Sequence, residues 1–133
     1  MERRIRSLGK KIFIVLFFIC NACEKNDSKL EGIFTGKLVK KGICMNYVIQ
    51  VDDKSFPKNL IEEIWIDEFS GKEYSNVFAL ESVCDFPEDI NQDETFKFII
   101  DMKKENLCAV CKAYTPVPSK YISITVINNK KSE

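Results

Sequence analysis

Two residue types that serve many functional sites are missing from most of this chain. The sequence contains no histidine, and its three arginines, Arg3, Arg4 and Arg6, lie at the N-terminus. Histidine is the commonest general base and metal ligand, and arginine supplies the planar fork that grips phosphate and carboxylate groups. The usual catalytic triads and arginine clamps are therefore excluded from the rest of the chain. We predict a protein that is not an enzyme and that holds no cofactor or metal.

A strongly basic surface is also missing beyond the N-terminal segment. The formal net charge of the whole chain is +0. Residues 23–133, however, carry 15 lysines against 19 acidic residues, so their net charge is about −4. Nucleic-acid binding needs a basic patch or stripe that attracts the phosphate backbone. The charge balance therefore predicts no nucleic-acid partner.

Residues 1–22 have the layout of a signal peptide. The basic segment MERRIRSLGKK precedes the apolar run IFIVLFFI, which is far shorter than the roughly 20 residues of a permanent membrane-spanning helix. Ala22 then directly precedes Cys23. A small residue before a cysteine at this place resembles the lipobox of bacterial lipoproteins, which implies that Cys23 becomes a lipidated N-terminus. Cys20 stands where leucine is usual, and an ordinary secretory peptide cleaved near Ala22 is the alternative.

Residues 23–30 are expected to be the lipidated cysteine and a flexible tether. The run EKNDSK after Cys23 is charged and contains no apolar side chain, so it cannot pack against a core. Lipid on Cys23 implies that the membrane is the first partner, because each buried CH₂ group contributes about 0.8 kcal/mol. We expect anchoring to the bacterial outer membrane, in its periplasmic or cell-surface leaflet.

Residues 31–128 are expected to form one β-domain, because pieces of strand length alternate in hydropathy and are separated by turn residues. We expect five strands, at residues 33–40, 44–52, 76–83, 95–102 and 121–127. A short helical or irregular excursion is expected at residues 58–69, and one helical turn at Pro87. This order predicts an all-β, five-stranded antiparallel OB-like Greek-key barrel, with a small β-sandwich as the alternative. Residues 129–133 are expected to be a disordered tail.

For several side chains the sequence predicts whether they are buried or exposed. In the last strand, alternation predicts Ile122, Ile124 and Val126 inward and Ser123 and Thr125 outward. Charged pairs are interpreted as solvated turn charges; they include Lys40-Lys41 and Asp67-Glu68.

Three segments carry a resemblance to a known group of proteins. They are GKLVKKGICMNYVIQV, the turn FPEDI before TFKFII, and CAVCKAYTPVPSKYISITV. Together they resemble small uncharacterised lipoproteins of the Bacteroidota with OB-like barrels, over most of the chain that follows the leader. The resemblance implies a fold and a location, and no activity.

Four further cysteines, Cys44, Cys84, Cys108 and Cys111, predict a disulfide framework in an exported domain. We favour long-range pairs that join Cys44 and Cys84 separately to Cys108 and Cys111. The alternative pairing joins Cys108 to Cys111 and Cys44 to Cys84. The Cys-Ala-Val-Cys spacing also leaves a thiol redox site or a zinc site open as an alternative function, although the prolines that follow disfavour the helix that a redox pair needs.

Aromatic side chains are the remaining candidates for a binding surface. In OB-type domains, aromatics in loops beside the sheet often stack on ligands. The possible ligand-facing residues are Trp65, Tyr74, Tyr114 and Tyr121. If they cluster, they would bind a glycan or peptide, and the alternative is that they cap a small core. We expect the partner to be an unknown envelope protein or extracellular ligand.

Overall fold

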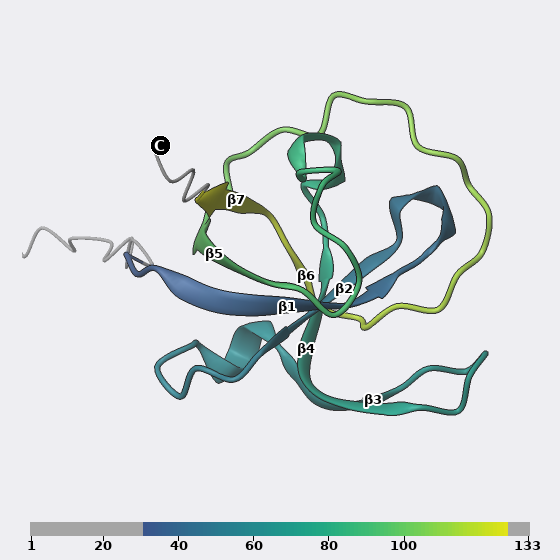
Figure 1. The fold of residues 1–133 in the computed structure, drawn as a ribbon, viewed down its shortest axis with the longest axis horizontal. Helices are drawn as coiled ribbons and strands as arrows, with labels where there is room; N and C mark the ends of the chain where they lie inside the picture. Colours follow the sequence, from purple (N-terminus) through teal and green to yellow (C-terminus); the bar gives the residue numbers. More distant parts are fainter. Residues whose placement is uncertain (1–30, 128–133) are drawn as a thin grey trace, which may run out of the picture.

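The β-domain is built from short strands and single helical turns (Figure 1). The computed structural model describes residues 31–127, so the predicted signal peptide, Cys23 and the predicted tail lie outside the described residues. The strands are β1 (Phe34–Lys41), β2 (Tyr47–Val51), β3 (Glu62–Ile66), β4 (Glu73–Leu80), β5 (Thr95–Ile100), β6 (Tyr121–Ile122) and β7 (Ile124–Ile127). The 3-10 turns are η1 (Ile43–Met45), η2 (Lys58–Leu60) and η3 (Val83–Asp85). The expected all-β class is confirmed.

All seven strands belong to one sheet. Its order is β3-β4-β2-β1-β5-β7, and β6 pairs with β4 in addition. The β4–β6 pair is parallel and the others are antiparallel. At Ser123 the last segment changes partner from β4 to β5. The seven-stranded sheet does not close into a barrel, so the expected five-stranded barrel is wrong in strand number and in closure.

The main core lies on one face of the sheet and is dominated by phenylalanine. Phe78 and Phe98 are fully buried, and Phe34, Phe56 and Phe96 pack around them. Phenylalanine rings bury large apolar areas and pack edge to face or offset. A few large aromatic side chains thus form the centre of this core.

Gly36 allows β1 to lie close to this core. A Cβ atom at Gly36 would come within 2.9 Å of both Ile49 and Phe98. Real side chains avoid such a distance, so only glycine fits without movement of the two neighbours.

A smaller core covers the opposite face of β1, β2 and β4. It consists of Val39, Val48 and Val77, against which Trp65, Tyr74 and Val117 pack. Successive residues of a strand point to opposite faces, which explains why Val39 and Val48 lie here while their neighbours enter the main core. Val117, in the segment that leads into β6, therefore brings that segment onto this second face.

The largest departure from the expected secondary structure is the segment 58–69. It was expected to be a helical or irregular excursion, but it forms η2 and then β3. Its Ile64, Trp65 and Ile66 pair with Ser75, Tyr74 and Glu73 of β4. β-branched and aromatic side chains favour a strand wherever a neighbouring strand offers a free edge, and β4 begins early enough to offer one.

Smaller departures have local backbone causes. The second strand begins at Tyr47 instead of Cys44, because Cys44 and Met45 adopt left-handed φ values of 55° and 59° inside η1. The helical turn forms at η3 instead of Pro87, which begins a turn closed by the Ile90 N–H donating to the Pro87 carbonyl at 3.4 Å. Ser123 was expected to point outward but is buried, because the chain changes strand partner there.

Candidate functional site

Two disulfides hold the long connection between β5 and β6, which Figure 1 draws as a wide arc at the edge of the molecule. Cys84 bonds to Cys108 with Cα atoms 5.5 Å apart, and Cys44 bonds to Cys111 with Cα atoms 5.0 Å apart. The structure therefore has the long-range pattern, and Cys108 and Cys111 do not bond to each other. One loop is thus attached to η3 and to η1.

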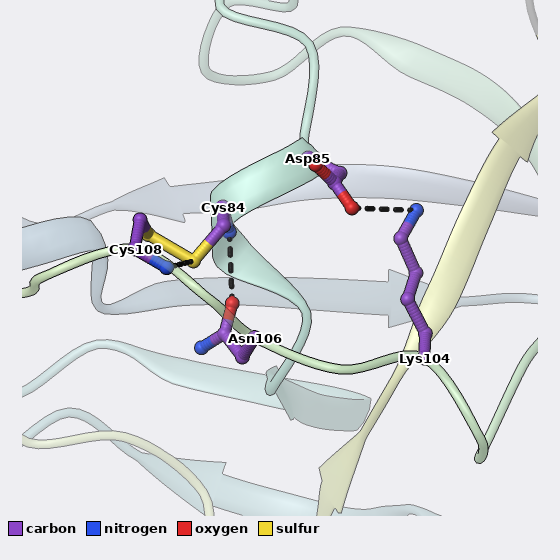
Figure 2. The surroundings of a disulfide bond; sticks show 5 residues. All are labelled: Cys84, Asp85, Lys104, Asn106 and Cys108. Carbon is purple, nitrogen blue, oxygen red and sulfur yellow. Dashed lines mark hydrogen bonds and ion pairs between the residues drawn. A yellow bond between two sulfur atoms is a disulfide. The ribbon is translucent and has the colours of Figure 1, made fainter.

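Polar contacts surround the Cys84–Cys108 bond (Figure 2). The Cys108 N–H donates to the Cys84 sulfur at 2.9 Å, and the Cys84 N–H donates to Asn106 Oδ1 at 3.0 Å. Lys104 Nζ lies 3.6 Å from the Asp85 carboxylate and also donates to Thr125. These contacts fix the first half of the loop beside η3.

The chemistry of the four sulfur atoms follows from this pairing. A sulfur in a disulfide is neither a nucleophilic thiolate nor a zinc ligand. A zinc site or a dithiol redox pair made of Cys108 and Cys111 would therefore require that both bonds first be reduced. Within residues 31–127 no group of three or more potential ligating side chains is placed to hold a metal ion.

Three of the four candidate aromatics lie near one another. Trp65 and Tyr74 are cross-strand partners on β3 and β4, and their rings stack with centroids 5.7 Å apart. Tyr114 meets Phe69 edge to face at 6.0 Å. Tyr121 lies elsewhere, on β6 opposite Ala79. We call Trp65, Phe69, Tyr74 and Tyr114 the aromatic cluster.

Lys40 joins the parts of the aromatic cluster. Its ammonium nitrogen lies 5.4 Å from the Trp65 ring centroid and 5.8 Å from that of Phe69. The same nitrogen donates to Asp67 Oδ1 at 2.9 Å and to the Pro116 carbonyl at 3.1 Å. A cation over an aromatic face is attracted by the ring quadrupole, so Lys40 stabilises both rings while its charge is balanced by Asp67.

Asp67 is the buried anion of this site, although the sequence suggested a solvated turn. Its carboxylate also accepts hydrogen bonds from the Phe69 N–H at 3.3 Å and from Ser70 Oγ at 2.9 Å. Burial alone would raise the pKa of Asp67, but the hydrogen bonds from Lys40, Ser70 and Phe69 and the charge of Lys40 outweigh it, so the pKa is lowered. The expectation that Lys40 and Asp67 are solvated is therefore wrong.

The sequence did contain a signal for this turn. Asp67 is followed by Ser70 and Gly71, and aspartate side chains commonly accept hydrogen bonds from the backbone two residues on. Gly71 has a φ of +68° and donates its N–H to the Asp67 carbonyl at 2.7 Å. The turn is therefore organised around Asp67. Phe69, also overlooked, is presented by this turn with 67% of its surface exposed.

The outer part of the aromatic cluster combines exposed rings with polar groups. Tyr114 is 69% exposed, and its hydroxyl donates to the Glu68 carboxylate at 3.1 Å. This hydrogen bond, together with the negative charge of Glu68, raises the pKa of Tyr114 above its ordinary value. Lys72 adds a cation 4.8 Å from the Tyr74 ring centroid. The arrangement can stack against a ligand and hydrogen-bond to it.

Within residues 31–127, no helix has the length and apolar character needed to cross a membrane. No protein-family model matches the chain, and no curated protein or solved structure matches it either.

Proposed function

We propose that this chain is an exported lipoprotein, anchored to the bacterial outer membrane through lipid on Cys23. Its β-domain would serve as a non-enzymatic binding or accessory module for an envelope protein or an extracellular ligand. The observation that carries the proposal is the Ala22-Cys23 junction at the end of a basic and then apolar leader. Thioether-linked and N-linked acyl chains on one cysteine give effectively permanent anchoring.

Features of the domain agree with this role. Disulfides persist in oxidising compartments and stabilise small exported domains, and the chain has two of them at long range. The proposed OB-like strand order is supported by β1, which pairs with both β2 and β5, and by the parallel pairing of β6 with β4. In this chain that order would belong to an open, seven-stranded sheet.

The aromatic cluster is the surface that we propose for ligand contact. Phe69 and Tyr114 expose most of their rings, while Lys40 and Asp67 hold the turn beneath them. Rigid aromatic side chains give contact area at little entropic cost. The cluster is held in place by an ion pair, a disulfide-bound loop and stacking, so the surface is prepared before a ligand arrives.

The anchor is tested by replacing Cys23. Full-length protein with Cys23→Ser should move from the membrane fraction to the soluble periplasmic or extracellular fraction and from the detergent phase to the aqueous phase. Cys20→Ser is the matched control, because Cys20 belongs to the proposed leader and its protein should remain membrane-bound. Membrane retention of Cys23→Ser with unchanged acyl labelling would refute the anchor.

The ligand surface is tested by a pair of variants. Immobilised full-length protein is incubated with outer-membrane extract and with soluble envelope glycans. A component retained by wild type and by Tyr121→Ala, but lost with Phe69→Ala and Tyr114→Ala, would support binding through the aromatic cluster. Retention that is equal for all four proteins would contradict it.

A further inference from the structure

β3 is an edge strand. It pairs with β4 on one side and with no other strand of the described residues. The outer side of β4 is shared, because β3 pairs with it over residues 73–77 and β6 pairs with Ala79 and Leu80. In Figure 1 the β3–β4 hairpin projects away from the rest of the sheet.

The backbone of β3 offers hydrogen-bonding groups along this outer edge. The Asp67 N–H donates to the Lys72 carbonyl at 2.9 Å, so these two residues form a hydrogen-bonded pair at the end of the ladder. In an antiparallel ladder such pairs alternate with pairs whose N–H and C=O groups point away from the partner strand. Ile66 opposite Glu73 and Ile64 opposite Ser75 are therefore pairs of the second kind. Both isoleucines direct an amide and a carbonyl outward.

The side chains of the same two residues are also available. Ile64 is 65% exposed and Ile66 is 55% exposed, and residues two apart lie on the same face of a strand. Natural edge strands are often protected by charged side chains, lysine especially, by proline or by a bulge. The sequence of β3, EEIWI, contains no lysine or proline, its two glutamates both precede Ile64, and its pairing with β4 is regular.

The charge of the hairpin identifies what could bind there. Acidic residues flank the two isoleucines on both sides; they are Glu62, Glu63, Asp67 and Glu68. Glu62 is held by Ser119, Asp67 by Lys40 and Glu68 by Tyr114, whereas Glu63 is exposed beside the free edge. A second copy of β3 would bring the same acidic residues to the same edge, and residues 62–68 contain no cation to balance them. The antiparallel register that pairs Ile64 with Ile66 of the second copy would also set Glu63 against Asp67, and like charges directly opposite are destabilising.

We infer that the outer edge of β3 binds an extended segment of a partner protein that alternates lysine with aliphatic residues. The segment would extend the sheet by one strand, with backbone hydrogen bonds to Ile64 and Ile66 and with a lysine near Glu63. Addition of a strand to a free edge is a common mode of peptide recognition. This inference deepens the proposed binding role, and it does not depend on lipid at Cys23 or on a ligand for the aromatic cluster.

The single tryptophan of the chain is a built-in reporter, because Trp65 lies between the two isoleucines on β3. Purified full-length protein in detergent is titrated with a seven-residue peptide of alternating lysine and valine, and Trp65 emission is followed. The matched probe replaces every lysine by glutamate. We expect saturable binding of the lysine peptide, at least ten-fold tighter than that of the glutamate peptide. No saturable binding, or equal binding of both peptides, would overturn the inference.

Three variants distinguish edge pairing from nonspecific binding. Ile66→Pro removes an outward N–H without removing a hydrogen bond to β4, so it should weaken peptide binding about ten-fold, whereas Ile66→Val should leave it within two-fold. Circular dichroism and disulfide mapping show whether Ile66→Pro is folded. Glu63→Lys leaves the backbone intact and should reduce the preference for the lysine peptide at least three-fold. An unchanged preference, or a concentration-dependent dimer that buries β3 in wild type, would contradict the proposed partner.

Discussion

The ammonium nitrogen of Lys40 lies 2.9 Å from Oδ1 of Asp67, and this contact ties the end of β1 to the turn between β3 and β4. The side chains are only 15% and 6% exposed. Lys40 also reaches the Pro116 carbonyl, so one cation joins three segments that are distant in the sequence. The aromatic cluster is arranged around this pair.

Asp67→Asn should destabilise the domain markedly. Loss of one partner from a buried ion pair leaves the other charge uncompensated, at a cost of about 3 kcal/mol. The free energy of unfolding, measured by urea denaturation, should fall by about this amount. Asp93→Asn is the control, because its ion pair with Lys37 is exposed and should contribute less than about 1 kcal/mol. Equal effects of the two substitutions would contradict the role given to Lys40 and Asp67.

Acid should remove the contribution of Asp67. Its pKa in the folded protein is lowered, so the unfolded state binds the proton more tightly. The resulting stabilisation is present above the unfolded pKa of about 3.9 and is lost as the pH falls through the lower folded pKa. The difference in unfolding free energy between wild type and Asp67→Asn should therefore shrink below about pH 4. A difference that grows under acid would show that the pKa of Asp67 is not lowered in the folded protein.

Removal of either disulfide should destabilise the domain, and the longer loop should contribute more. The Cys44–Cys111 bond spans 67 residues and the Cys84–Cys108 bond spans 24. In the chain-entropy model such bonds contribute about 3 to 4.5 kcal/mol, with the larger value for the longer loop. Double serine variants of each pair, compared by denaturation, should show this order. Peptide mapping of wild type should recover the same two pairs, and a Cys108–Cys111 peptide would contradict the structure.

Glu68→Gln should lower the pKa of Tyr114. The carboxylate of Glu68 raises that pKa through a hydrogen bond from the Tyr114 hydroxyl and through its negative charge. The amide keeps an acceptor and removes the charge, so the phenol should ionise at a lower pH. NMR titration of the tyrosine resonances checks this, and Tyr121, which lies outside the aromatic cluster, is the internal control. An unchanged titration of Tyr114 would show that the contact is absent in solution.

The sequence predicted those parts of the fold that depend on local alternation. The bounds predicted for β1 and β5 nearly match the observed ones. Their large apolar side chains alternate with other residues and enter one core; they include Phe34, Leu38, Phe96 and Phe98. The even number of cysteines indicated the disulfide framework, and it is present. These features require only the identity of neighbouring residues.

Features that depend on distant partners were missed. Ile64 and Trp65 fit both helical and strand spacing, and only the free edge of β4 decides for a strand. Ser123 is buried because two different strands flank it. Lys40 and Asp67 lie far apart in the chain, so nothing local distinguishes them from solvated charges.

Mass spectrometry of the N-terminal peptide of the membrane-extracted protein tests the central claim most directly. The account predicts a peptide that begins at Cys23 and carries the mass of a diacylglycerol thioether and an N-linked acyl chain. The same peptide should lack residues 1–22. An unmodified Cys23 in a membrane-bound protein, or an N-terminus upstream of Ala22, would contradict lipid anchoring and the role proposed from it.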